Sequence, residues 1–171
     1  SVFPVFHGNL RGDKPGKTQM SFYDDLAGEY DALTSTADRQ PAARAFVCEL
    51  RKRIPLEKAL DVACGTGLYT LALAETGTAV VGTDASAGML VQARLASEKA
   101  GLSVRWVPAD MTDLPADVGE EFDAVLCMGN SVPHLIEDKQ LTSALTGFFD
   151  TLAPGGSAFV HLLNYRRILQ R

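Results

Sequence analysis

The chain has 171 residues, of which 46% are hydrophobic and 22% charged, so it can form one folded domain with a sizeable core. Its 16 basic and 21 acidic residues give a net charge of −5, which argues against nucleic acid as a partner. Three cysteines without CxxC spacing argue against a disulfide framework or a metal site. Without a secretory signal pattern or a run of about 18 apolar residues, we expect a cytoplasmic protein with no membrane span.

The N-terminal part is expected to divide into a tail and two helices. Residues 1–20 are rich in glycine and proline and predict a tail or loop, to which the apolar residues at positions 2–6 could add an edge strand. The domain proper is expected over 21–171. Apolar residues at helical spacing predict a helix over 22–33 and a second over 40–54, with Pro41 tolerated in its first turn.

Strand-like and helical segments alternate along the rest of the chain, which predicts an α/β fold with a Rossmann-like, doubly wound, mostly parallel sheet. In such sheets, ligands bind beyond the carboxyl ends of the strands. The predicted strands are 58–63, 78–84, 102–110, 122–128 and 156–164, and the helices between them are 68–75, 86–99 and 139–152.

The stretch "LDVACGTG" (60–67) predicts a glycine turn between the first strand and the following helix. Gly65 and Gly67 match the first two glycines of a dinucleotide fingerprint, but the third position is Thr70. Without a Cβ, both glycines would let the backbone approach a ligand closely. Asp61 would repel a pyrophosphate but can hold an ammonium group, directly or through a water, while Asp84 suits a ribose. A ligand with a ribose at one end and an ammonium at the other fits this pattern.

Four motifs in order resemble the class I S-adenosylmethionine-dependent methyltransferases: "LDVACGTG", "VVGTDAS" (80–86), the strand end at Asp110, and "FDAVLCMGNS" (122–131). The similarity is closest to the glycine N-methyltransferase-like branch, on the strength of "CMGNSVPHL" (127–135) and "LLNYRRIL" (162–169). It extends from about Tyr23 to Leu169, nearly the whole chain apart from the tail.

The resemblance implies S-adenosyl-L-methionine as cofactor and S-adenosyl-L-homocysteine as product. It further implies in-line methyl transfer to a small-molecule acceptor, with an amine nitrogen as the expected acceptor atom. Asn130 would orient the acceptor, and His134 would help to organise the site or relay a proton. Tyr23 matches the family's tyrosine position less well than Tyr30 does. The implied cofactor-binding residues are Tyr30, Arg39, Asp61, Ala63, Gly65, Gly67, Asp84, Ala85, Met89, Asp110, Met111 and Met128.

Several of these residues also have a purely structural interpretation. Asp84 would accept hydrogen bonds from the ribose hydroxyls, but it could instead cap the next helix. Asp110 would accept from the adenine amino group or cap its own loop. Met89 would cover adenine or fill the core. Asn130 could merely cap a turn, and Arg39, implied to pair with the cofactor carboxylate, could be an ordinary surface residue.

The sequence departs from the glycine-specific relatives at the substrate. They place an Arg before the "NY" pair to clamp a carboxylate, and this chain has Leu163 there. Arg166 and Arg167 could form a shifted clamp. The sixth and seventh strands usual in the class are not found, so we expect the domain to be incomplete at its C-terminus.

Two other functions compete with a methyltransferase. A methyltransferase-like module could bind the cofactor without catalysis and serve in assembly or regulation. A NAD(P)-binding oxidoreductase domain is disfavoured by Asp61 and Thr70. Cys64 lies in the glycine turn, but no base is placed by sequence to activate it as a nucleophile.

Overall fold

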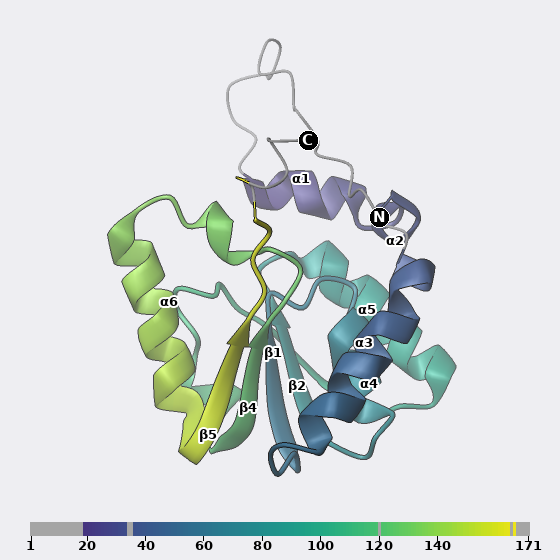
Figure 1. Cartoon of the computed structure of the whole chain (residues 1–171). Helices are drawn as coiled ribbons and strands as arrows, with labels where there is room; N and C mark the ends of the chain where they lie inside the picture. Colours follow the sequence, from purple (N-terminus) through teal and green to yellow (C-terminus); the bar gives the residue numbers. More distant parts are fainter. Residues whose placement is uncertain (1–18, 34–35, 120, 165, 167–171) are drawn as a thin grey trace.

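The described strands form one parallel sheet in the order β3-β2-β1-β4-β5 (Figure 1). The structure is a computed structural model that describes residues 19–33, 36–119, 121–164 and 166. The parallel sheet confirms the predicted fold class, and the described residues contain no further strand. The strands are β1 (Lys58–Val62), β2 (Ala79–Asp84), β3 (Arg105–Pro108), β4 (Phe122–Cys127) and β5 (Leu152–Val160).

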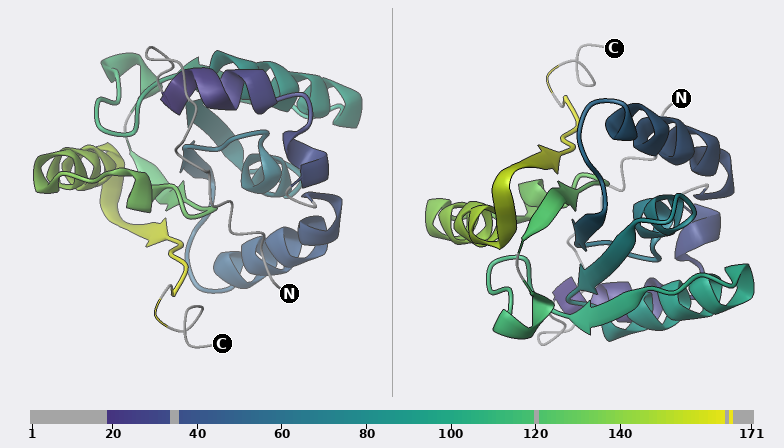
Figure 2. Two further views of the ribbon diagram at one scale, coloured as in Figure 1. Left: turned by 90° about the horizontal axis from the view of Figure 1, so that it is seen from above. Right: turned by 90° about the horizontal axis from the view of Figure 1, so that it is seen from below.

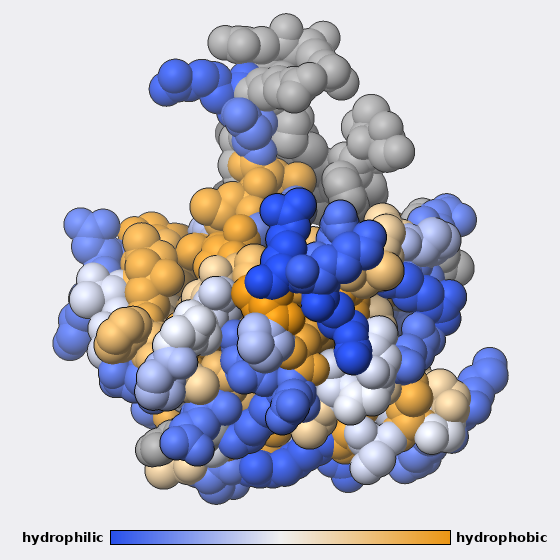
Figure 3. Space-filling model, turned by 60° about the horizontal axis from the view of Figure 1, so that its bottom comes forward, coloured by the Kyte–Doolittle hydropathy of each residue, from blue (hydrophilic) through white to orange (hydrophobic). Residues whose placement is uncertain are grey.

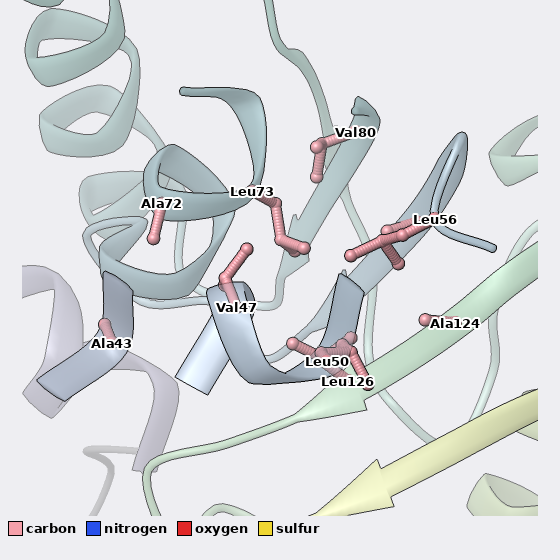
Figure 4. Close-up of a cluster of buried hydrophobic side chains, with 10 residues drawn as sticks. Ala43, Val47, Leu50, Leu56, Ala72, Leu73, Val80, Ala124 and Leu126 are labelled. Atoms are coloured by element: carbon pink, nitrogen blue, oxygen red, sulfur yellow. The ribbon is translucent and has the colours of Figure 1, made fainter. Parts of the chain in front are cut away.

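Helices cover both faces of the sheet, as seen along the strands in Figure 2. On one face, α3 (Thr36–Arg51) and α4 (Leu68–Ala74) pack against β1, β2 and β4. Figure 4 shows this contact, in which Val47 of α3 and Leu73 of α4 are both fully buried. α5 (Ala87–Ala100) packs next to α4 through Trp106, and α6 (Asp138–Thr151) covers the opposite face.

Two short helices lie across the carboxyl ends of the strands, above the sheet in Figure 1. They are α1 (Gln19–Leu26) and α2 (Tyr30–Leu33), separated by a turn where the sequence predicted one continuous helix. α1 begins within the segment expected to be a tail. The edge strand suggested at positions 2–6 lies outside the described residues.

β5 differs most from its predicted bounds of 156–164. It begins at Leu152, directly after α6, because "APGG" (153–156) is accommodated as an irregularity of the strand. β5 advances from Leu152 to Ser157 while its partner β4 advances only from Phe122 to Ala124. Gly155 has φ +84°, and a Cβ on Gly156 would lie 2.7 Å from the Phe122 carbonyl oxygen, so the local backbone requires both glycines.

β3 is also shorter than the predicted 102–110. Its last pairing joins Pro108 to Asp84, where β2 ends, so no strand is left beside the residues that follow. Before β3, the Leu102 amide donates to the Ser97 carbonyl at the end of α5, which keeps that residue out of the sheet. Strand length is therefore limited here by the neighbouring elements.

Hydrophilic side chains predominate in the view from below the sheet, with apolar side chains in smaller areas between them (Figure 3). Exposed apolar residues include Ile136 and Phe149, at 90% and 76% exposure. None of the helices described here is long and apolar enough to traverse a bilayer.

Candidate active site

A cavity of about 250 Å³ opens at the carboxyl ends of the strands, and a smaller one of about 50 Å³ adjoins it. They share Tyr30, Ala63 and Gly65 among their lining residues. The larger cavity is also lined by the predicted residues Asp84, Ala85, Met89, Asp110, Met111 and His134. The smaller is also lined by the predicted residues Arg39, Asp61 and Met128. Gly67 and Asn130 line neither cavity.

Asp84 joins the two loops that border the larger cavity. Its Oδ2 accepts from the Gly65 amide at 2.8 Å, and its Oδ1 accepts from the Ser86 amide at 2.9 Å. Burial raises the pKa of Asp84, and the two backbone hydrogen bonds oppose that shift. Asp84 therefore binds the backbone at the start of α5 through Oδ1, as the capping interpretation predicts, and it also lines the cavity. Each oxygen keeps a second lone pair for a ligand hydroxyl.

Asp61 lies deep beside the smaller cavity, with 2% of its surface exposed. Burial raises its pKa to about 7, although a hydrogen bond from Thr70 favours the charged form. The Thr70 hydroxyl donates to Asp61 Oδ2 at 2.6 Å. Thr70 was considered only as a departure from the dinucleotide fingerprint. A sequence signal for this role exists: Thr70 is a small polar residue in the mostly apolar helix "LYTLALA". In the structure this residue is buried.

The glycine turn is held in an unusual backbone conformation. Ala63 has φ +53°, which is uncommon for a residue with a Cβ, and Gly65 has φ +58°. The Cys64 amide donates to the Thr83 carbonyl at 2.9 Å, which fixes the turn against β2. These constraints present Ala63 and Gly65 to both cavities.

Gly67 has a packing role that the sequence prediction missed. It adopts φ +88°, and a Cβ there would lie 2.8 Å from Cη2 of Trp106. A Cβ at this position would meet the indole ring that packs against α5, and the expected close approach to the cofactor stays a prediction.

We expect Gly67→Ala to lower the free energy of unfolding by about 1–3 kcal/mol, because it adds overpacking to a strained φ. Gly77→Ala is the matched control: Gly77 has φ +82° with no atom within 4 Å of the added Cβ. It should cost only about 1 kcal/mol. Urea unfolding of both variants measures the difference. Equal losses would show that Trp106 does not require glycine at position 67.

The structural interpretations of Asp110 and Met89 are confirmed, and both residues also line the larger cavity. Asp110 Oδ1 accepts from the Thr112 amide at 2.8 Å and from its hydroxyl at 2.7 Å, so it caps its own loop while lining the larger cavity. Met89 is only 2% exposed, yet it also lines this cavity. A residue such as Met89 can therefore belong to the core and line a cavity at the same time.

Asn130 lines neither cavity, and its side chain has a backbone partner after β5. It adopts φ +72°, and its Oδ1 accepts from the Leu163 amide at 2.9 Å. This bond fixes the segment that follows β5. The neighbouring Gly129 and Ser131 line the larger cavity instead. The expected contact of Asn130 with the acceptor stays a prediction.

The mouth of the larger cavity carries an aromatic group. Tyr23 Oη lies 3.3 Å from His134 Nε2, and the two rings meet edge to face with centroids 6.2 Å apart. Tyr23 also meets Tyr30 edge to face at 6.4 Å. Burial raises the pKa of both tyrosines, so both hydroxyls are protonated donors at neutral pH. Tyr23 thus lines the larger cavity together with Tyr30.

Of the remaining sequence candidates that the structure describes, Cys64 lines the smaller cavity and the possible substrate-clamp residues do not. Arg166 is exposed, Arg167 lies outside the described residues, and neither Leu163 nor Arg166 lines a cavity. Burial raises the pKa of the Cys64 thiol well above its usual value, so it stays protonated and is a poor nucleophile. The described residues hold no cluster of metal-ligating side chains.

Comparison with known proteins places this fold and site in one class. Residues 59–156 match a family described as a methyltransferase domain. The chain is 33% identical over 152 residues to a glycine/sarcosine N-methyltransferase of Parasynechococcus marenigrum, covering 89% of this chain and 54% of that protein. It is 36% identical over 148 residues to the glycine N-methyltransferase of Rattus norvegicus, covering 80% and 50%.

Among solved structures, an S-adenosylmethionine-dependent methyltransferase from Clostridium acetobutylicum superimposes with a TM-score of 0.73 at 24% identity, over 87% of this chain and 61% of that one. The chain therefore belongs to the class I S-adenosylmethionine-dependent methyltransferases, near the glycine N-methyltransferase branch. It spans about half the length of the two curated relatives.

Proposed function

We propose that the chain binds S-adenosyl-L-methionine across the two adjoining cavities and transfers its methyl group to the nitrogen of a small-molecule amine. The observation that carries this proposal is the placement of two carboxylates at neighbouring strand ends. Asp84 faces the larger cavity and Asp61 the smaller, with the glycine turn between them. This arrangement fits a ligand with a ribose at one end and an ammonium at the other.

The larger cavity is assigned to adenosine. Asp84 accepts from the ribose hydroxyls, and Asp110 accepts from the adenine amino group. Met89 and Met111 supply an apolar surface for the base. Thr112, which donates twice to Asp110, holds that carboxylate in a fixed orientation.

The smaller cavity is assigned to the methionyl end. Asp61 holds the ammonium, and Arg39 offers a cation for the carboxylate. Tyr30 and Ala63 line both cavities, which supports their assignment to the surroundings of the reacting centre. Bound there, the cofactor supplies a methyl group on a sulfonium, which an acceptor lone pair displaces in line. The protein's part is to align the acceptor and exclude water.

The acceptor enters beside Tyr23 and His134, at the mouth of the larger cavity. These side chains offer hydrogen bonds but no fixed positive charge, and the position occupied by a carboxylate-binding Arg in the glycine-specific relatives is Leu163 here. An amine without a carboxylate therefore suits this site better than glycine. His134 is available to relay the proton that the methylated nitrogen releases.

Titration calorimetry with S-adenosyl-L-methionine, S-adenosyl-L-homocysteine and NAD tests the cofactor. We expect the first two to bind and NAD not to bind; the reverse would identify an oxidoreductase domain. Methylation of an amine panel tests the reaction, with glycine and sarcosine against amines that lack a carboxylate. Cofactor binding without turnover on any amine would instead support the non-catalytic module.

For Asn130→Ala we expect a turnover loss of about 10- to 100-fold with cofactor affinity within a few-fold, because the segment at Leu163 is released beside the acceptor space. Asn130→Asp keeps the Oδ1 acceptor and tolerates a positive φ, so it should retain most of the activity. Turnover numbers and cofactor dissociation constants separate these effects. If Asn130→Asp is as inactive as Asn130→Ala, the Asn amide contacts the acceptor directly.

A further inference from the structure

A carboxylate of helix α1 binds the N-terminus of α5. Asp24 Oδ1 accepts from the Ser86 hydroxyl at 2.5 Å and from the Gly88 amide at 3.0 Å. Ser86 is itself the N-cap of α5 and accepts from the Met89 amide at 3.2 Å. Asp24 thus extends the cap of α5 with a side chain from another helix. The Ser86 hydrogen bond, followed by that of Gly88, lowers the pKa of Asp24.

The α1–α5 contact also depends on small residues. A Cβ on Gly88 would lie 3.1 Å from the Asp24 Cα, from the Asp24 carbonyl oxygen and from the Ala27 Cβ. Ala27 is 5% exposed, so this close approach is buried. Two independent features therefore hold α1 against the start of α5: the close backbone packing at Gly88 and the hydrogen bonds of Asp24.

This attachment has a direct consequence for the cavity. Ser86 lines the larger cavity on the side of β2, and Tyr23 reaches His134 on the side of β4. Tyr23 immediately precedes Asp24, so one turn of α1 contacts residues on both sides of the larger cavity. The Thr66 hydroxyl donates to Asp31 Oδ1 at 2.5 Å and ties α2 to the glycine turn in the same manner.

We propose that Asp24 is a positioning residue for methyl transfer: by capping α5 from α1, it holds Tyr23 and Tyr30 over the cofactor and acceptor. The assignment rests on the proposed function for its effect on catalysis, but the docking of α1 can be measured without cofactor. Loss of the cap releases α1, exposes the cavity and speeds cofactor escape. Tyr23 then no longer meets His134.

Two variants disrupt the docking by different means. Asp24→Ala removes the acceptor, and Gly88→Ala keeps Asp24 but forces the backbones apart. Each has a matched control. Glu29→Ala removes an exposed carboxylate from the turn between α1 and α2, and Gly28→Ala adds a Cβ that meets nothing within 4 Å. Asp24→Asn keeps an acceptor oxygen and should partly rescue the loss.

Hydrogen exchange of the free protein should show faster exchange in residues 19–26 for Asp24→Ala and Gly88→Ala, and parental exchange for both controls. The same two variants should weaken S-adenosyl-L-methionine binding about tenfold through faster dissociation, the equivalent of one charge-assisted hydrogen bond. The melting temperature of the sheet core should change little.

Unchanged exchange in residues 19–26 would overturn the docking role of Asp24, whatever the protein binds. Altered exchange with parental cofactor dissociation and turnover would overturn its role in positioning. Failure of the parent itself to bind S-adenosyl-L-methionine would refute the proposed function instead and leave the exchange result standing.

Discussion

Replacing Asp84 by alanine should weaken S-adenosyl-L-methionine binding by about 30- to 1000-fold, the equivalent of about 2–4 kcal/mol. The carboxylate is assigned to both ribose hydroxyls, which form charge-assisted hydrogen bonds with it. It also accepts from the Gly65 and Ser86 amides, so its loss loosens the glycine turn and the start of α5 together. Titration calorimetry of both proteins provides the two dissociation constants.

Asp113→Ala is a suitable control for this experiment. Asp113 is an exposed carboxylate in the loop after β3 and does not line the cavity. Its replacement by alanine removes the same type of side chain as Asp84→Ala. Its affinity should stay close to that of the parent. An Asp84→Ala affinity within threefold of the parent would remove Asp84 from the cofactor site, whatever the control shows.

The sequence predicted the fold and most of the cavity because both depend on local patterns. Alternating strands and helices imply a parallel sheet, and residues at consecutive strand ends must then meet at one edge. That argument correctly places Asp61, Asp84 and Asp110 at one edge of the sheet. It needs no knowledge of which side chains pack together.

The differences arise where a distant part of the chain determines the outcome. Gly67 is required by Trp106, which arrives from β3, and the bulge at "APGG" is set by pairing with β4. The sequence predicts that Asn130 orients the acceptor or caps a turn, whereas the contact of its Oδ1 with the Leu163 amide depends on the segment after β5. Each of these contacts joins segments that are far apart in sequence, so no local sequence pattern predicts them.

Thr70 shows that a fingerprint comparison can also miss a buried contact between residues close in sequence. A fingerprint comparison treats Thr70 as a missing glycine. In the fold, its hydroxyl meets Asp61 and favours the charged form of a carboxylate that burial makes difficult to ionise. Only the crossing of α4 over β1 brings these two residues into contact.

Asp61→Asn is expected to make the protein more stable at neutral pH while it weakens cofactor binding by about 30-fold or more. Burial raises the pKa of Asp61 from 3.8 to about 7, so the folded chain retains a proton that the unfolded chain has released between these values. The stability of the parent therefore falls as pH rises from about 4 to about 7. The asparagine avoids that loss and should add about 2–4 kcal/mol at pH 8, but almost nothing at pH 4.

Urea unfolding at the two pH values measures this gain, and calorimetry from pH 5 to pH 7 measures its functional counterpart. Because only ionised Asp61 attracts an ammonium, the affinity of the parent should rise by up to about tenfold per pH unit below 7. That of Asp61→Asn should rise less steeply, because only Asp84, whose pKa burial also raises, still titrates in the cofactor site. Thr70→Val keeps the side-chain shape but removes the hydroxyl that favours ionisation, so the rise should move to higher pH. A parent affinity independent of pH, or a Thr70→Val profile that matches it, would show that the charge on Asp61 does not hold the cofactor.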